Sequence, residues 1–147
     1  MPNALFVQAA VEELPAELDG LASEVFVQFP WGSLLRGVAG GDELVTRNLR
    51  RICSLNARLH VTLGVDLERD RYEWKRLELP EISRDYIEKV LRTRYRRVGF
   101  RIVKTERVSA TDLAQRYSSW AKRLQQSDSR LFFSIVAVAG DVGSNRR

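Results

Sequence analysis

The chain has 147 residues, of which 44% are hydrophobic and 29% are charged, the composition of a single globular domain of ordinary length. No apolar run reaches the eighteen or so residues that a membrane helix needs, and the first residues lack the basic start of a signal peptide, so we expect a cytoplasmic protein without a membrane partner. One cysteine and one histidine exclude an internal disulfide and the usual zinc sites, so no metal is expected.

The first half of the chain alternates short apolar runs with helical patterns, which is typical of βα units around a parallel sheet. We predict strands at Leu5–Ala9 and Val25–Phe29, with a short helical stretch at Pro15–Leu21 between them. Ser33 stands where the N-terminal cap of a helix belongs, and that helix is predicted to begin at Leu34.

Gly40-Gly41-Asp42, the end of the segment "GVAGGD", interrupts this helix, which then resumes over residues 43–54. The glycines of this segment resemble a phosphate-binding loop only superficially, because they follow a helix and not a strand. We therefore interpret them as an interhelical turn. The apolar face of the resumed helix is predicted to consist of Leu44, Val45, Leu49 and Ile52.

In the second half, Arg58–Gly64 alternates as a strand, and a charged, irregular segment, Asp66–Glu81, follows it. Ser83 is predicted to cap a long helix that reaches Val98, and Gly99 supplies the left-handed stop after it. The side chains of that helix expected to point inward are Tyr86, Val90, Leu91 and Tyr95.

Two further strands are predicted at Phe100–Thr105 and Leu131–Ala139, separated by a polar connection over residues 109–130. This connection shows no clear crossover helix, so the two strands are expected to form an antiparallel pair at a sheet edge. Class I methyltransferase sheets end in this way. Residues 1–140 are expected to form the domain, and residues 141–147 a flexible tail.

The charge balance is basic, with 24 lysines and arginines against 19 acidic residues, and only four of the basic residues are lysines. Arginine forms planar, bidentate contacts with phosphate and stacks on bases, which favours a nucleic-acid partner. Heavy arginine use by a GC-rich genome explains the same composition equally well.

Nucleophilic catalysis has no visible apparatus, because His60 lies on the strand face opposite Leu59 and Val61 and is interpreted as a structural or surface residue. The small side chains of Ala9 and Ala10, at the end of the first predicted strand, leave room for a flat ligand. Glu12 or Glu13 could accept hydrogen bonds from such a ligand. A solvated turn is the alternative interpretation.

Two tryptophans, Trp31 and Trp120, stand outside any regular apolar period, and Trp74 lies among charges. A pair of such rings above strand ends could hold a flat, unstacked base, as enzymes that modify bases commonly do. Local packing of each ring is the alternative.

The segments "PNALFVQAAVEELPAEL", "QFPWGSLL" and "SSWAKRL" followed by "LFFS" resemble, in order and spacing, the aminoglycoside-resistance methyltransferases that modify N1 of adenine 1408 in 16S rRNA. The similarity runs from Pro2 to about Gly140. The resemblance implies a class I, Rossmann-like α/β sheet, the cofactor S-adenosyl-L-methionine, and a 16S rRNA substrate within the small (30S) ribosomal subunit.

The resemblance also assigns roles to single residues. Trp31 and Trp120 match the two tryptophans that hold the flipped adenine. The positions that match the cofactor site are Ala10, Glu12, Pro30, Ser33 and Ser118. The positions that match the RNA-contacting linkers are Lys75, Arg76, Arg123 and Arg130.

The chain departs from the family in two places. It has no D-x-G-T-G-x-G loop and none of the first strands, so we expect it to be the C-terminal two thirds of a class I domain, from a misassigned start or a true fragment. Asp128 stands where family members tend to carry a basic residue, and its charge would oppose phosphate. The alternative to an enzyme is a non-catalytic rRNA- or ribosome-binding remnant that has lost the cofactor site.

Overall fold

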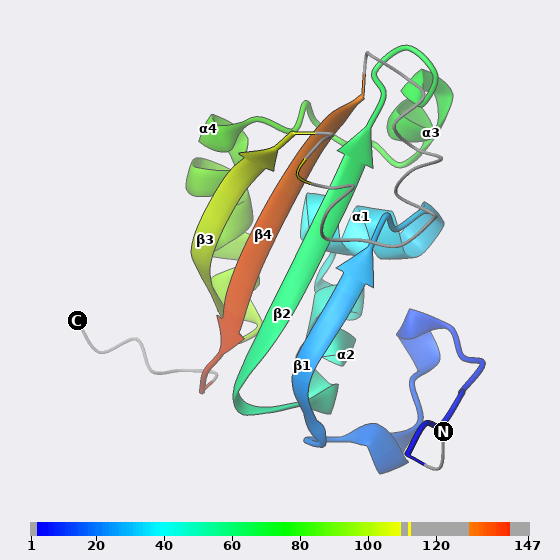
Figure 1. The fold of residues 1–147 in the computed structure, drawn as a ribbon, viewed down its shortest axis with the longest axis vertical. Helices are drawn as coiled ribbons and strands as arrows, with labels where there is room; N and C mark the ends of the chain where they lie inside the picture. The colour runs from blue at the N-terminus through cyan, green and yellow to red at the C-terminus, as the bar shows by residue number, and fades with distance from the viewer. Residues whose placement is uncertain (1–2, 110–111, 113–129, 142–147) are drawn as a thin grey trace.

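The computed structural model describes residues 3–109, 112 and 130–141. Four strands within these ranges form one sheet in the order β1-β2-β4-β3. The strands are β1 (Ala22–Gln28), β2 (Cys53–Val65), β3 (Phe100–Val108) and β4 (Leu131–Ala139). β1 and β2 run parallel, whereas β4 is antiparallel to both of its neighbours, which confirms the antiparallel pairing predicted for the last two strands (Figure 1).

The helices between β1 and β2 and the long helix before β3 cover one face of this sheet in Figure 1, whereas the short helix after β2 lies beside the upper end of that strand. The helices between β1 and β2 are α1 (Gly32–Gly40) and α2 (Glu43–Ile52). Between β2 and β3 come α3 (Arg71–Arg76) and then a continuous helix of three parts, namely α4 (Arg84–Tyr86), the π-helical turn η3 (Ile87–Leu91) and α5 (Arg92–Arg97). Two 3₁₀ turns, η1 (Val11–Glu13) and η2 (Ala16–Leu18), precede β1.

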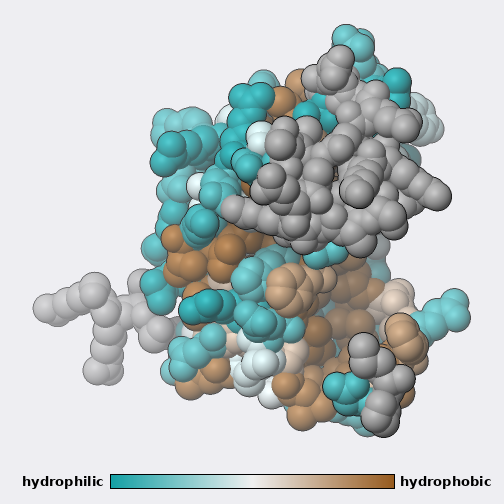
Figure 2. All heavy atoms as spheres, viewed as in Figure 1, coloured by the Kyte–Doolittle hydropathy of each residue, from teal (hydrophilic) through white to brown (hydrophobic). Residues whose placement is uncertain are grey.

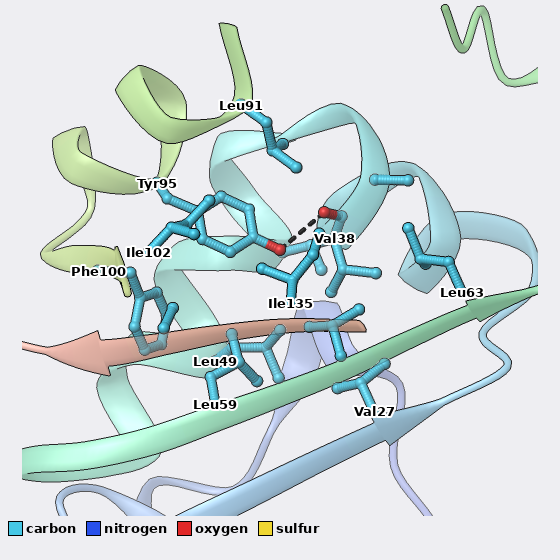
Figure 3. Packing of buried hydrophobic residues seen from close by; sticks show 14 of the residues in the cluster. Val27, Val38, Leu49, Leu59, Leu63, Leu91, Tyr95, Phe100, Ile102 and Ile135 are labelled. Carbon is cyan, nitrogen blue, oxygen red and sulfur yellow. Dashed lines mark hydrogen bonds between the residues drawn. The ribbon is translucent and has the colours of Figure 1, made fainter. Parts of the chain in front are cut away.

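The core lies between these helices and the odd-numbered side chains of the two central strands. Leu59 and Val61 of β2 pair in register with Ala137 and Ile135 of β4, and all four side chains are fully buried. Successive strand residues point to opposite faces, so this alternation puts one apolar row of each strand under the helices (Figure 3).

The C-terminal end of α1 is held by side chains of the helix over residues 84–97. The last carbonyls of a helix have no partner within it. The hydroxyl of Tyr95 donates to the carbonyl oxygen of Val38 at 2.7 Å, the dashed contact in Figure 3, and the hydroxyl of Tyr86 donates to that of Ala39 at 2.9 Å. The guanidinium of Arg94 donates to the carbonyl oxygen of Gly40. Three consecutive carbonyl groups of α1 therefore have side-chain donors.

The other face of the sheet displays polar and apolar side chains together (Figure 2). The ring of Phe26 stacks on that of His60, with centroids 4.5 Å apart and planes at 7°. His60 therefore lies opposite Leu59 and Val61, as predicted, and its ring packs against a neighbouring strand.

The strand predicted at Leu5–Ala9 is wrong. These residues have no regular structure, and the side chains of Leu5 and Phe6 are 83% and 94% exposed. A strand exists only beside a neighbour that satisfies its backbone groups. Within the described chain the sheet ends at β1, which pairs with β2.

Three local predictions are also wrong. α1 begins at Gly32 with Trp31 at the N-cap position, so Ser33 is not the cap. Leu44 is exposed, and Thr46 takes its place on the buried face of α2, where the Thr46 hydroxyl bonds the carbonyl of Asp42 at 2.8 Å. The segment between β2 and the long helix is not wholly irregular, since it contains α3.

Other predictions of the helix ends are confirmed. The Ser83 hydroxyl accepts a hydrogen bond from the Tyr86 backbone N–H at 3.1 Å, and Gly99 is left-handed with φ of 95°. The glycine-rich segment is an interhelical turn, since Gly41 ends α1 with φ of 72° and Asp42 caps α2. The described helices are all too short or too polar to cross a membrane.

Replacing Tyr95 by phenylalanine tests the anchoring of α1. Tyr95→Phe leaves the buried Val38 carbonyl without its donor, so the free energy of unfolding is expected to fall by about 1–3 kcal/mol in urea titrations. Tyr72→Phe is the matched control, because the Tyr72 side chain is 80% exposed and its change is expected to stay within about 0.5 kcal/mol. Equal effects of the two substitutions would contradict the anchoring role.

Candidate functional site

Three segments meet at one end of the sheet. β1 and β2 are parallel, so their carboxyl ends lie at the same edge, and antiparallel β4 begins there (Figure 1). In sheets of this kind, ligands bind outside the carboxyl ends of the strands. The turn after β1, the α3 segment after β2 and Arg130 before β4 are therefore the candidate surroundings of a site.

The turn after β1 presents an indole to solvent. Two residues of the turn are left-handed, Phe29 with φ of 50° and Gly32 with φ of 58°. Between them, Pro30 is buried and the Trp31 side chain is 56% exposed. An exposed tryptophan at a strand end presents a large flat surface that can stack on a ligand.

Two predicted cofactor residues are brought together beside this turn. The hydroxyl of Ser33, in the first turn of α1, faces the carboxylate of Glu12 in η1 and lowers its pKa. The side-chain amide of Asn48 in α2 donates to the backbone carbonyl oxygen of Glu12 at 3.0 Å. Ala10 immediately precedes η1, so it lies on the same segment. The structure thus joins Ala10 and Glu12 to the turn that carries Pro30 and Ser33.

Glu12 is held as a carboxylate by its surroundings. The hydrogen bond from Ser33 lowers the pKa of Glu12, a backbone hydrogen bond within Glu12 lowers it further, and the charge of Arg36 acts in the same direction. An ionised carboxylate accepts hydrogen bonds and donates none. It therefore suits a ligand that presents hydroxyl or amino groups.

The two basic residues of α3 that are expected to contact RNA, Lys75 and Arg76, have different surroundings. Lys75 is exposed, whereas the guanidinium of Arg76 is engaged by the carboxylate of Glu73 at 2.8 and 2.5 Å. That pair lowers the pKa of Glu73. Trp74 is 8% exposed and its indole N–H donates to the carbonyl oxygen of Pro80 at 2.9 Å. Trp74 therefore packs locally, and Lys75 is the freer cation of the two.

The remaining predicted residues fall before β4. Arg130 is half-buried, and within the described chain its Nε atom is buried without a hydrogen-bond partner. The predictions for Ser118, Trp120, Arg123 and Asp128 lie outside the described residues.

Sequence reasoning missed two residues of this end of the sheet. Arg71, the first residue of α3, lines the same pocket as Lys75, which follows it by four residues. The i, i+4 spacing would have found it had α3 been recognised as a helix. Phe29 was assigned to the strand, and the Pro-Trp-Gly that follows it was the available signal of an unusual turn.

Comparison with known proteins identifies one family. A model of the NpmA family, 16S rRNA (adenine(1408)-N(1))-methyltransferase, matches residues 1–139. The 16S rRNA (adenine(1408)-N(1))-methyltransferase of Streptoalloteichus hindustanus is 32% identical and covers 97% of this chain and 64% of its own length. The Escherichia coli protein of the same description is 29% identical, with 92% of this chain and 62% of the relative covered.

A solved structure agrees with these relatives. The 16S rRNA (adenine(1408)-N(1))-methyltransferase from Catenulisporales acidiphilia, crystallised as a tryptophan-to-alanine mutant with the cosubstrate SAM, matches with a TM-score of 0.77 and 32% identity. The match covers 94% of this chain and 62% of that chain. The present chain thus spans less than two thirds of the length of each of these three proteins.

The contact between Ser33 and Glu12 predicts a pH dependence. Because the pKa of Glu12 is lowered in the folded chain, the contact stabilises the fold fully above the ordinary glutamate pKa of about 4.3, and this stabilisation is lost as the pH falls through the lower folded value. Ser33→Ala is expected to destabilise the chain by a constant amount, below about 1 kcal/mol, from neutral pH down to about pH 5. Below that pH, the difference from the wild type is expected to shrink.

Carboxyl ¹³C NMR titration checks the same contact directly, since Ser33→Ala should raise the pKa of Glu12. Ser23→Ala, at an exposed serine of β1, serves as the control and should leave the Glu12 titration unchanged. A Glu12 titration that is identical in the wild type and Ser33→Ala would rule the contact out.

Proposed function

The chain belongs to the NpmA family of 16S rRNA (adenine(1408)-N(1))-methyltransferases, and from this premise we propose that it takes part in methylating N1 of an adenine in 16S rRNA, with S-adenosyl-L-methionine as methyl donor. The substrate is the rRNA of the small (30S) ribosomal subunit, and the modification is of the type that gives aminoglycoside resistance. The chain supplies the target-base side of the site and a part of the cofactor side.

The observation that carries the proposal is the exposed indole of Trp31 at the carboxyl end of β1, next to Ser33, which lowers the pKa of the Glu12 carboxylate. Stacking a base on an aromatic side chain contributes about 1–3 kcal/mol. A base extruded from its helix leaves its own stack, so an aromatic face at the site compensates in part for that loss. Trp31 is the first half of the clamp, and Trp120 is proposed as the second from the sequence alone.

The residues beside Trp31 suit the flat part of the cofactor. Ala9 and Ala10 are exposed and small, which leaves room for a purine ring, and the Glu12 carboxylate accepts hydrogen bonds from hydroxyl or amino groups. Ala10, Glu12, Pro30 and Ser33 would hold this part, together with Ser118. The sequence contains no D-x-G-x-G-x-G segment, so no residue of this chain is assigned to the remaining parts of the cofactor.

The chemistry requires alignment and no proton acceptor. Adenine N1 carries a lone pair and no proton, and the bound cofactor supplies a methyl group on a positively charged sulfonium. Trp31 would orient the adenine so that N1 faces the methyl group, which is an entropic contribution to the rate. The π face of its indole also favours the positive charge that passes to the adenine.

The basic side chains of α3 are proposed to contact the phosphates of the rRNA. Lys75 projects into solvent, and Arg71 lines the same pocket one helical turn away. Arg76 shares its charge with Glu73, which reduces its attraction for a phosphate. Lys75 is therefore expected to contribute more to RNA binding than Arg76.

Trp31→Ala tests the clamp. The substitution removes a stacking face and the alignment it provides, so methyl incorporation into small ribosomal subunits is expected to fall by about 100-fold or more, with an unchanged circular dichroism spectrum. Phe26→Ala is the matched control, because Phe26 lies on the same strand and is 57% exposed, and it should retain turnover. Wild-type turnover by Trp31→Ala would refute the clamp.

Calorimetry with S-adenosyl-L-methionine, run on the same protein, separates the enzyme from its alternative. If the chain binds small ribosomal subunits but neither binds the cofactor nor transfers a methyl group, the non-catalytic rRNA-binding interpretation replaces the enzyme.

Lys75→Gln tests the RNA surface. Affinity for small ribosomal subunits falls as salt rises, so log affinity against log salt concentration has a negative slope. Loss of one phosphate contact is expected to reduce the magnitude of this slope by about 1. Arg76→Gln should lower it by less. Lys89→Gln, which removes a lysine paired with Asp85 at 2.8 Å on the long helix, should leave the slope unchanged. An unaltered slope for Lys75→Gln would exclude a phosphate contact at this residue.

A further inference from the structure

The backbone of Phe29 is unusual for its residue type. Its φ of 50° lies in the left-handed region, which side chains larger than those of glycine and asparagine rarely adopt. Gly32, three residues later, reaches a similar φ without steric cost because it has no Cβ. The strain of the turn is therefore concentrated at Phe29, one residue before the buried Pro30.

Two contacts hold Phe29 in place. Its backbone N–H donates to the carbonyl oxygen of Thr62 at 2.9 Å, which extends the pairing of β1 with β2 one residue past the end of β1. Its ring meets the ring of Phe132 edge to face, with centroids 6.2 Å apart and planes at 82°. Phe132 is the second residue of β4 and its side chain is 2% exposed.

Gly64 makes the ring contact possible. It lies between the two rings on β2 and pairs in register with Phe132. A Cβ at Gly64 would lie 3.2 Å from the Phe132 ring, which is tighter than an ordinary contact, and 3.4 Å from the Phe29 ring, which is ordinary van der Waals contact. Because Gly64 has no side chain, β2 has a gap at this position, the notch at Gly64. The ring of Phe29, just after β1, contacts the ring of Phe132 of β4 across this notch.

We infer that Phe29 is a positioning residue for Trp31, fixed by Phe132 across the notch at Gly64; the inference deepens the proposed function and rests on it for its catalytic meaning. Only Pro30, whose φ is locked by its ring, separates Phe29 from Trp31. The first hydrogen bond of α1, from the Leu35 N–H to the Trp31 carbonyl oxygen, is long at 3.4 Å and holds Trp31 weakly from the helix side. On the strand side, the backbone next to Pro30 is held by the contacts of Phe29.

The same contact joins the two parts of the chain proposed to hold the base. Phe132 comes two residues after Arg130, at the end of the linker to which the sequence assigns Trp120. A shift of β4 would therefore be transmitted through Phe132 and Phe29 to the turn of Trp31. This linkage gives the start of β4 a role in base alignment as well as in sheet pairing.

The local motion of Trp31 measures positioning without cofactor, RNA or turnover. The sequence has three tryptophans, so Trp74→Phe with Trp120→Phe leaves Trp31 as the single fluorophore. In this background, shown to be folded by circular dichroism, time-resolved anisotropy separates tumbling of the whole chain from local rotation of the indole. Phe29→Gly keeps the backbone conformation accessible but removes the ring, and Phe132→Leu removes the partner ring.

Both substitutions are expected to raise the amplitude of the fast anisotropy decay at least twofold, at a temperature well below the unfolding transition. Phe29→Tyr keeps the ring and should restore the amplitude of the background. Phe26→Leu is the control, since it removes a ring of the same strand that stacks on His60 and not on Phe132. Phe100→Leu, in the buried face of β3, controls for lost stability alone.

An unchanged amplitude in Phe29→Gly or in Phe132→Leu overturns the inference. A rise in the two control variants as large as in these two also overturns it, because general loosening of the fold would then explain the result. Failure of the proposed function is a separate result. If Trp31→Ala methylates at the wild-type rate while Phe132→Leu increases the local motion of the indole, the proposed base clamp is refuted but the positioning contact is supported.

Discussion

The fixed position of α1 is the constraint on which the rest of the structure depends. Three carbonyl groups at its C-terminal end accept hydrogen bonds from side chains of the helix over residues 84–97, including the buried hydroxyl of Tyr95. Its N-terminal end directly follows the turn after β1, in which Phe29 and Gly32 have left-handed backbones. Because buried carbonyl groups without donors cost free energy, α1 cannot slide along the sheet without losing these bonds. These bonds therefore also hold the site residues in the first turn of α1 in a fixed position relative to the core.

The position of α1 also determines where the segment with Ala10 and Glu12 lies. η1 has only three residues and no buried side chain, so it has little stability of its own. It is held from α2 by Asn48, which donates to the Glu12 carbonyl oxygen, and by Val11, which packs against the core, and Ser33 of α1 lies beside the Glu12 carboxylate. The segment with Ala10 and Glu12 is therefore placed by the two helices, and the candidate cofactor side depends on α1 as the base side does.

The sequence predicted those parts that local chemistry decides. The strands predicted at Arg58–Gly64 and Leu131–Ala139, the cap at Ser83 and the stop at Gly99 follow from side chains within a few residues of each other, and the structure confirms them, with β2 extended to Cys53–Val65. The strand at Leu5–Ala9 was predicted wrongly because its pattern is right but a strand also needs a neighbour, which pattern alone does not provide. Ser33 was misassigned for a related reason, since α1 begins at Gly32 and the Ser33 hydroxyl faces a residue distant in sequence, Glu12.

The candidate site is marked by residues whose burial or backbone conformation is unusual for their residue type. Trp74 is not unusual, with a buried ring and a bonded N–H, and it has no proposed role in function. Trp31 is unusual because its indole is exposed, and Phe29 is unusual because its backbone is left-handed. Sequences agree with their fold at most positions, so two such exceptions within three residues indicate a constraint other than stability. Alignment of a flat substrate is a constraint of that kind, because it requires a ring held open to solvent in a fixed direction.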